Sequence, residues 1–323
     1  MRYLATGTAK QISKIGLGTW QFGSKEWGYG DPYADQESHA IVRRALQLGV
    51  TLFDTAEIYG YGRSERILGR ALGEDLDSVF LATKILPVLP LAPVVEQRAV
   101  ASANRLGARH LDLYQMHQQN PVVRDGPAMR GMRALQRVGL VGEVGVSNYS
   151  LDRWRAAEAA LGGPVLSNQV QYNLVERAPE RDLLPYAEAE GRVIIAYSPL
   201  AQGLLSGRYH RDNLPANRVR GANPLFLPEN IERASELIGV LRGVADAHAA
   251  TPAQIALAWV IRSPAVTAIP GASSVEQLES NVAAADIDLS DDEDQALRSA
   301  SDRFQPLTGP GLLPRLLRAR FGR

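Results

Sequence analysis

The stretch Val79-Phe-Leu-Ala-Thr-Lys84 is an apolar run that ends in a single charged residue. Similar short runs, rich in aliphatic residues, recur along the whole 323-residue chain. Runs of this kind are typical of parallel strands that are covered on both faces. The eight strands that we predict are residues 15–18, 51–54, 79–84, 111–117, 143–147, 165–169, 193–198 and 265–270.

Longer helical stretches fill the gaps between these runs, and several end at a glycine, a residue that stops a helix in a left-handed conformation. The predicted helices are residues 36–48, 64–72 (with Ser64 as its cap), 93–106, 127–138, 150–161, 179–190, 252–262 and 274–284. Strands alternating with helices in this way predict a (β/α)8 TIM barrel. The competing doubly wound sheet would carry Gly-x-Gly-x-x-Gly after its first strand, and Gly16-Leu-Gly18 does not complete that motif.

Three segments lie outside this alternation, within what we interpret as a single domain over residues 1–323. Residues 2–13 predict a hairpin that closes the bottom of the barrel. Residues 201–230 form a long loop rich in Gly, Pro, Arg and Asn, typical of a lid, and an extra helix is expected at 229–249, before the last strand. The tail 306–323 is basic, and it is either a solvated, mobile end or a flap over the mouth.

Composition excludes several classes of function. The 35 basic and 35 acidic residues cancel, which argues against a nucleic-acid binder. The absence of cysteine excludes disulfides and thiolate chemistry, and the five histidines show no His-x-x-x-His spacing, so we predict no metal site. No apolar run approaches the roughly 18 residues that span a bilayer, and the N-terminus has no apolar signal core. We therefore expect a cytoplasmic protein without membrane partners.

Polar residues stand where the predicted strands end, the edge at which barrels of this kind do their chemistry. Asp54, Lys84 and His117 end the second, third and fourth strands, and Tyr59 follows in the glycine-rich loop after Asp54. Only four of the 35 basic residues are lysines, and Lys84 is the only one after residue 25. The later strands end in Ser147, Asn148, Asn168, Gln169, Tyr197 and Ser198.

These four residues can form an acid–base set. A nearby ammonium lowers the pKa of a tyrosine, and Asp54 can serve as counter-ion to Lys84. Each residue alone has a simpler interpretation: Lys84 as a surface lysine, Asp54 as a helix cap, Tyr59 as loop packing, and His117 as a core imidazole. Their joint position on successive strand ends favours the catalytic interpretation.

The motifs around these residues resemble those of the aldo-keto reductases. Residues 49–60 (Gly-Val-Thr-Leu-Phe-Asp-Thr-Ala-Glu-Ile-Tyr-Gly) are similar to a first family signature. The other similar motifs are 81–84, 111–117, 145–148, 168–173, 197–203 and 269–281, in the expected order. The resemblance is strongest to a bacterial and plant branch that is also similar to potassium-channel β subunits.

This resemblance implies a TIM barrel that reduces aldehydes or ketones to alcohols with NADPH. It implies that Tyr59 is the general acid, that Lys84 and Asp54 tune it, and that His117 orients the carbonyl. It further implies that Ser147, Asn148 and Gln169 hold the carboxamide while Tyr197 stacks on the nicotinamide. The remaining expected cofactor residues are Thr19, Trp20, Ser198, Leu200, Gly203, Leu205, Arg208, Gly271, Ser273, Gln277 and Asn281.

The chain departs from the family pattern at the adenosine end. Some relatives place Lys and Arg where this chain has Gly271 and Gln277, so the charge for a 2′-phosphate would come from Arg218 or Arg220. Ser280 stands where close relatives often have a glutamate near the adenine. The resemblance therefore implies NADPH and leaves NADH open.

The resemblance implies a small carbonyl compound as substrate, and aromatic residues suggest an apolar pocket wall. The candidates are Trp20, Trp27, Tyr29 and Tyr149, with Tyr172 and Phe226 as further ones. Two other functions stay open on the sequence: a cofactor-binding regulatory protein similar to channel β subunits, with low turnover, and an aldolase that uses Lys84 as a Schiff base.

Overall fold

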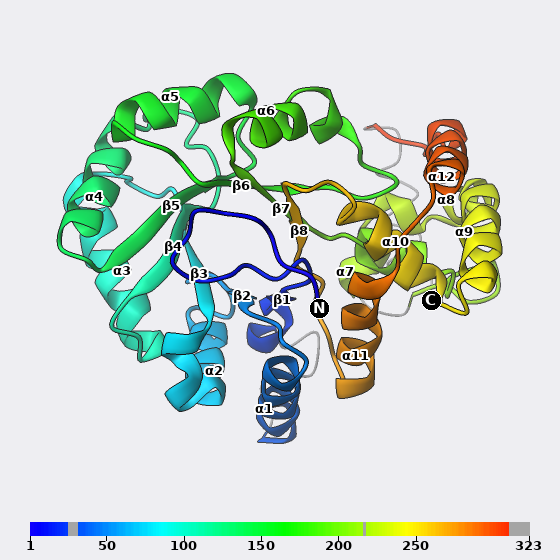
Figure 1. The fold of residues 1–323 in the computed structure, drawn as a ribbon, viewed down its shortest axis with the longest axis horizontal. Helices are drawn as coiled ribbons and strands as arrows, with labels where there is room; N and C mark the ends of the chain where they lie inside the picture. Colours follow the sequence, from blue (N-terminus) through cyan, green and yellow to red (C-terminus); the bar gives the residue numbers. More distant parts are fainter. Residues whose placement is uncertain (25–31, 216–217, 310–323) are drawn as a thin grey trace.

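The computed structural model describes residues 1–24, 32–215 and 218–309, and within these it contains eight parallel strands in one curled sheet. The strands follow one another in chain order from β1 to β8 (Figure 1). Backbone hydrogen bonds also join the two outer strands, from Gly16 N to the Ala268 oxygen and from Ala268 N to the Lys14 oxygen, so the sheet closes into a barrel. The strands are β1 Leu17–Gly18, β2 Leu52–Asp54, β3 Phe80–Ile85, β4 Leu111–Met116, β5 Val141–Ser147, β6 Ser167–Gln171, β7 Val193–Tyr197 and β8 Val266–Ala268.

Helices return the chain along the outside of the barrel after each strand from β2 to β6 (Figure 1). Their inner faces pack against outward-facing strand residues in the main apolar core, which lies between the helices and the sheet. The glycines expected to end helices have positive φ: Gly49, Gly107, Gly139, Gly162 and Gly191. The helices of this part are α1 Pro32–Gln47, α2 Arg63–Leu72, α3 Ala92–Leu106, α4 Gly126–Arg137, α5 Leu151–Leu161 and α6 Leu183–Glu190, with the 3-10 helices η1 Trp20–Gly23, η3 Gly73–Ser78 and η4 Ala178–Arg181.

The chain between β7 and β8 is built from short helical pieces rather than one open loop. In place of the extra helix expected over 229–249, two helices, α8 and α9, meet at Ala234. The elements of this half are η5 Ala201–Ser206, α7 Arg218–Gly221, η6 Pro224–Phe226, α8 Pro228–Arg233, α9 Ser235–Ala247, α10 Pro252–Val260, α11 Val275–Ala283, η7 Ala284–Asp286 and α12 Asp291–Arg303.

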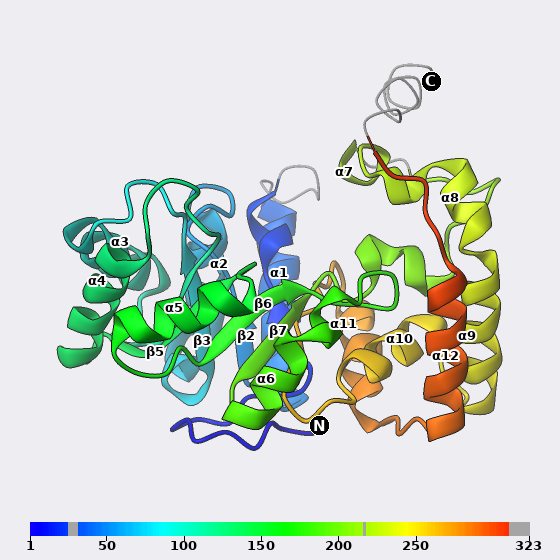
Figure 2. The ribbon, with the colours of Figure 1, turned by 90° about the horizontal axis from the view of Figure 1, so that it is seen from above.

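The N-terminal segment folds back on itself at the end of the barrel where the strands begin (Figure 2). Tyr3 and Ser13 form an antiparallel bridge, and Leu4 N donates to the Ile12 oxygen at 2.8 Å. Leu4 and Ile12 are buried in a second apolar cluster together with inward-facing strand residues such as Phe80. The segment therefore covers the lower end of the barrel interior and leaves the opposite rim to the polar strand ends.

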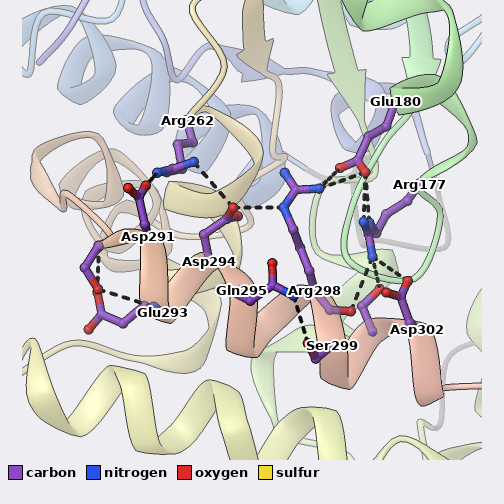
Figure 3. A network of polar contacts seen from close by, with 12 residues as sticks. Arg177, Glu180, Arg262, Asp291, Glu293, Asp294, Gln295, Arg298, Ser299 and Asp302 are labelled. Atoms are coloured by element: carbon purple, nitrogen blue, oxygen red, sulfur yellow. Dashed lines mark hydrogen bonds and ion pairs between the residues drawn. The ribbon is translucent and has the colours of Figure 1, made fainter.

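Helix α12 is joined to the barrel wall by a chain of ion pairs (Figure 3). Arg298 lies between Asp294 and Glu180, with nitrogen–oxygen distances of 2.9 and 2.8 Å. Arg177 pairs with the same Glu180 and with Asp302. Because Arg177, Glu180 and Arg298 are partly buried and share their partners, these pairs contribute more than isolated surface pairs and hold α12 against η4.

Membrane-spanning helices and metal-binding clusters are both absent from the described ranges. Within them, no helix is long and apolar enough to cross a membrane. The same ranges contain no group of three or more His, Asp or Glu side chains arranged to hold a metal ion. Of the basic tail predicted at 306–323, only residues 306–309 are described, and the prediction of a flap falls on residues outside that part.

Candidate active site

Three of the four predicted catalytic residues lie at the ends of neighbouring strands. Asp54 is the last residue of β2, Lys84 is the last but one of β3, and His117 follows β4 directly. Because the strands are parallel, their carboxyl ends meet at one rim of the barrel. Tyr59 lies in the loop between β2 and α2, at the same rim. The fold thus brings all four side chains together.

The Lys84 side chain is fully buried and donates three hydrogen bonds. Its Nζ lies 2.6 Å from Asp54 Oδ1, 2.8 Å from the Thr55 carbonyl oxygen and 3.3 Å from the Tyr59 hydroxyl. Burial alone would lower the pKa of Lys84, but the Asp54 carboxylate and Tyr59 outweigh burial and raise it. Lys84 is therefore an ammonium at neutral pH, held at a fixed distance from the phenol.

The second carboxylate oxygen of Asp54 also accepts hydrogen bonds, from donors that the sequence did not predict. Asp54 Oδ2 accepts from Gln169 Nε2 at 2.8 Å and from Gln115 Nε2 at 3.3 Å. Gln169, expected to hold a carboxamide, thus also contacts the acid–base set. A signal for Gln115 was available, since it is a glutamine within an apolar run, two residues before His117 and so on the same side of the strand.

Tyr59 is a protonated phenol at neutral pH. Burial raises the pKa of Tyr59; the Lys84 ammonium lowers it, the Asp54 carboxylate raises it, and the net result is a raised pKa. The lowering by the ammonium that the sequence predicts is present, but burial outweighs it. What Lys84 does supply is a contact that reduces the cost of forming the phenolate.

His117 is held neutral. Burial, together with the smaller effect of the nearby Lys84 charge, lowers the pKa of His117 to about 3. Its ring meets the Tyr59 ring edge-on, with centroids 5.6 Å apart. Nδ1 of His117 is buried and has no hydrogen-bond partner among the described residues. The imidazole is thus a neutral group beside the phenol.

Two glycines allow the Tyr59 loop to pack closely against η1. A Cβ on Gly60 would lie 2.4 Å from the Gly23 carbonyl oxygen, and one on Gly23 would lie 2.6 Å from the Tyr59 carbonyl carbon. Such distances exclude any side chain at either position. The close contact of the two backbones fixes the loop that carries the Tyr59 side chain.

Behind Asp54, the hydroxyl groups of Thr19, Thr55 and Ser64 form a buried cluster, and the cap predicted at Ser64 is wrong. Ser64 does not cap α2, which begins at Arg63 after the left-handed Gly62; its hydroxyl instead donates to the Thr19 carbonyl oxygen at 2.7 Å. Thr19, expected to contact cofactor, is fully buried, and its hydroxyl donates to the Asp54 carbonyl oxygen at 3.0 Å. Both residues support the rim from within.

The residues expected to hold the nicotinamide are linked to one another. Ser147 Oγ donates to the Gln169 carbonyl oxygen at 2.9 Å, and the Tyr197 hydroxyl donates to Asn148 Oδ1 at 3.0 Å. Asn148 has a φ of 59°, an uncommon conformation for a residue other than glycine. Strained backbone of this kind gathers at functional sites, which makes the ends of β5, β6 and β7 a candidate binding surface.

Left-handed backbone continues after β7, along the expected phosphate path. Ser198, Ala201 and Gln202 have positive φ, as does Gly203. Leu205 is buried in the core, while the Arg208 side chain is exposed. Arg220 Nε donates to the Gln202 carbonyl oxygen at 2.8 Å, which places a guanidinium at this turn. The Arg218 side chain lies outside the described part.

The expected adenosine end is built of neutral polar groups. Ser273 donates to Gln277 Oε1 from both its N–H and its hydroxyl, each at 2.8 Å. Asn281 Nδ2 donates to the Gly271 carbonyl oxygen at 3.2 Å. A Cβ on Gly271 would lie 1.6 Å from Gln21 Nε2, so the Gln21 amide covers this glycine. Gln21 was not predicted.

The predicted aromatic wall is only partly placed at the rim. Trp20 is 41% exposed, as a pocket wall requires. Tyr149 is instead 2% exposed, and its hydroxyl donates to Asp125 at 2.7 Å, so it belongs to the core between β5 and the helices. Tyr172 and Phe226 are likewise buried. Trp27 and Tyr29 lie outside the described residues.

Comparisons with known proteins agree with the fold. The profile described as "Aldo/keto reductase family" matches residues 14–302. An uncharacterized oxidoreductase of Mycobacterium tuberculosis is 55% identical over 323 residues, which is all of both chains. The glycerol dehydrogenase of Gluconobacter oxydans has a TM-score of 0.86 at 28% identity, covering 95% of this chain and 98% of its own.

A second solved structure, an aldo-keto reductase of Klebsiella pneumoniae in complex with NADPH, has a TM-score of 0.75 at 28% identity. It covers 95% of this chain and 96% of its own. The family match spans nearly the whole barrel, from the residues just before β1 to α12. The protein is therefore an oxidoreductase that belongs to the aldo/keto reductase family.

Proposed function

We propose that the protein reduces aldehydes and ketones to alcohols with NADPH, and that Tyr59, Lys84, Asp54 and His117 carry the reaction. The observation that supports this most is the contact set around Lys84, whose ammonium touches both a carboxylate at 2.6 Å and a phenol at 3.3 Å. Such a set can deliver a proton and then stabilise the oxygen that lost it.

The nicotinamide cofactor, when bound, supplies a hydride to the carbonyl carbon. Tyr59 provides the matching proton to the carbonyl oxygen, so that the C=O group gains H⁻ and H⁺ and becomes an alcohol. Because burial keeps the phenol protonated, Tyr59 is in the donor state at neutral pH. The Lys84 ammonium then faces the phenolate that remains, and Asp54 keeps Lys84 in place.

His117 is proposed to orient the carbonyl by a hydrogen bond. With its pKa lowered to about 3, the imidazole is neutral across the physiological range. A neutral ring donates from one nitrogen only, so it binds a carbonyl oxygen without competing as a second acid. Trp20 is proposed as an apolar wall for the rest of the substrate.

The residues at the ends of β5 to β8, and in the loops that follow these strands, fit a nicotinamide cofactor. The platform of Ser147, Asn148 and Tyr197 offers amide and hydroxyl groups beside an aromatic ring. The left-handed run after Ser198 can turn backbone N–H groups toward phosphate. The Klebsiella relative, solved with NADPH, supports the choice of cofactor. Arg220, already held at the Gln202 turn, is our candidate for the 2′-phosphate.

The test is loss of NADPH absorbance when the protein is mixed with 4-nitrobenzaldehyde. We expect turnover that depends on both compounds and yields the benzyl alcohol. NADPH binding measured separately, by quenching of tryptophan fluorescence, shows whether the cofactor site is intact. Binding without any turnover over a panel of aldehydes and ketones would refute the proposal.

A further inference from the structure

We infer that Gln115 is a positioning residue for the reaction and acts through Asp54. This inference rests on the proposed function, because it assigns a role to a residue that contacts the same site. Gln115 is fully buried in β4, and its Nε2 lies 3.3 Å from Asp54 Oδ2. In the strand register it is paired with Lys84, so the two side chains enter the barrel side by side.

The orientation of the Gln115 amide follows from charge. The reverse orientation would place Oε1 against the Asp54 carboxylate, and two acceptors repel one another. With Nε2 toward Asp54, Gln115 Oε1 is left buried and without a hydrogen-bond partner among the described residues. An unpartnered buried amide oxygen costs stability. The chain keeps a polar side chain here despite that cost, which favours a role in holding Asp54.

The neighbouring strand leaves room for this side chain. Gly145 is the register partner of Gln115 on β5, and a Cβ there would lie 2.8 Å from Gln115 Cγ and 2.4 Å from Ser167 Oγ. Any larger residue at Gly145 would push Gln115 out of place. Gly145 belongs to one of the motifs that resemble the family. Here its lack of a side chain leaves space for Gln115 in the barrel interior.

The physical role is to fix one oxygen of Asp54 so that the other stays on Lys84. Gln115 and Gln169 donate to Oδ2, and Lys84 donates to Oδ1 at 2.6 Å. With one donor removed, the carboxylate can rotate and draw Lys84 away from Tyr59. Because Gln115 has no exposed surface, we expect it to act through Asp54 and not to contact the cofactor.

Gln115→Met keeps the length of the side chain and removes the donor. We expect kcat to fall about 10- to 100-fold, as for loss of a hydrogen bond to a charged group, with an unchanged dissociation constant for NADPH. Gln136→Met is the matched control, since Gln136 also donates one hydrogen bond, to Gly142, and has an unpartnered buried Oε1. An unchanged kcat in Gln115→Met, or equal losses in both variants, would overturn the inference.

Gln115→Glu gives a pH readout that a packing role would not produce. The introduced carboxyl can donate to Asp54 only when protonated, so its rate relative to the parent should rise as the pH is lowered. A ratio that stays constant with pH counts against the inference.

A double-mutant cycle of Gln115→Met and Asp54→Asn, read by urea midpoints, tests the contact without turnover. We expect non-additive shifts; additive shifts refute the inference even if the parent shows no reductase activity. Absence of parental turnover together with non-additive shifts would instead refute the proposed function alone.

Discussion

Lys84 shows why one residue type is required at the centre of this barrel. Its ammonium makes three contacts within 3.3 Å while its side chain has no exposed surface. A guanidinium is planar and longer, and it directs its donors in a rigid fork. In a chain where 31 of 35 basic residues are arginine, the position that must fit between Asp54 and Tyr59 is still a lysine.

Lys84→Arg should therefore remove most carbonyl reduction although the charge is kept. We expect kcat to fall at least about 100-fold, because displacing Tyr59 by about 1 Å has a cost of that order, while NADPH still binds. Lys10→Arg is the control; Lys10 is partly exposed and pairs with Asp112 at 2.9 Å, at the lower end of the barrel. Near-parental activity of Lys84→Arg would contradict the role given to the lysine.

His117 should make folding stability depend on pH. Its pKa is about 3 in the folded protein and 6.5 in the unfolded chain, so the unfolded chain binds the proton first as pH falls. Stability from this group is complete above pH 6.5 and is lost toward pH 3, by about 3 kcal/mol at pH 4. Urea unfolding of the parent and His117→Asn at pH 7 and pH 4 measures this. Equal acid losses in both proteins would show that His117 is not buried as described.

At the residue scale, the sequence predicts which groups meet but not how they balance. Asp54, Tyr59, Lys84 and His117 stand at strand ends in the sequence, so parallel topology alone brings them together. The net pKa of Tyr59 depends on how deeply its side chain is buried. That burial cannot be read from a single position in the sequence. The bonds from Gln115 and Gln169 to Asp54 cross the barrel interior, and they follow from closure of the sheet.

Helix ends were the most predictable feature at the scale of elements. Gly107 follows α3 with a φ of 68°, and nothing lies within 4 Å of a Cβ built there. The start of α2 was less predictable. Ser64 has the composition of a cap, but its hydroxyl is engaged by Thr19 and Thr55. A cap assignment from local sequence fails where tertiary partners compete for the hydroxyl.

Gly107→Ala and Gly243→Ala should change stability in opposite directions. Alanine at Gly107 must adopt the left-handed conformation, at about 1 kcal/mol. Gly243 lies within α9, is exposed and has open space around it, so alanine should stabilise by about 0.5–1 kcal/mol. Urea midpoints measure both, and kcat should stay unchanged in each. The same sign for both variants would contradict the backbone argument.

Arg220, in the segment between β7 and β8, is the residue that we propose distinguishes NADPH from NADH. Arg220→Ala should raise KM for NADPH about 10-fold, as expected for loss of a charge-assisted bond to phosphate, and leave KM for NADH unchanged. Arg242→Ala is a control on α9, where the guanidinium donates to the Gly207 carbonyl oxygen. Equal effects on NADPH and NADH would place Arg220 at the pyrophosphate instead.

The barrel architecture of the whole molecule is predicted by the succession of its strands more than by any single strand. All eight strands were predicted near their places, yet β1 has two residues and β8 three. The backbone hydrogen bond between Gly16 and Ala268, which joins the two edges of the sheet next to these strands, forms only when the barrel closes. The split of the expected helix 229–249 into α8 and α9 was not visible in a helical pattern that runs through Ala234.

We propose that Tyr59 donates a proton to the substrate while the bound cofactor donates a hydride. The most direct measurement is single-turnover oxidation of NADPH by 4-nitrobenzaldehyde in the parent and in Tyr59→Phe, which keeps the ring and removes the proton. We predict rapid oxidation in the parent and at least about a 100-fold slower rate in the variant, with NADPH bound equally by both. Equal rates in the two proteins would contradict the account.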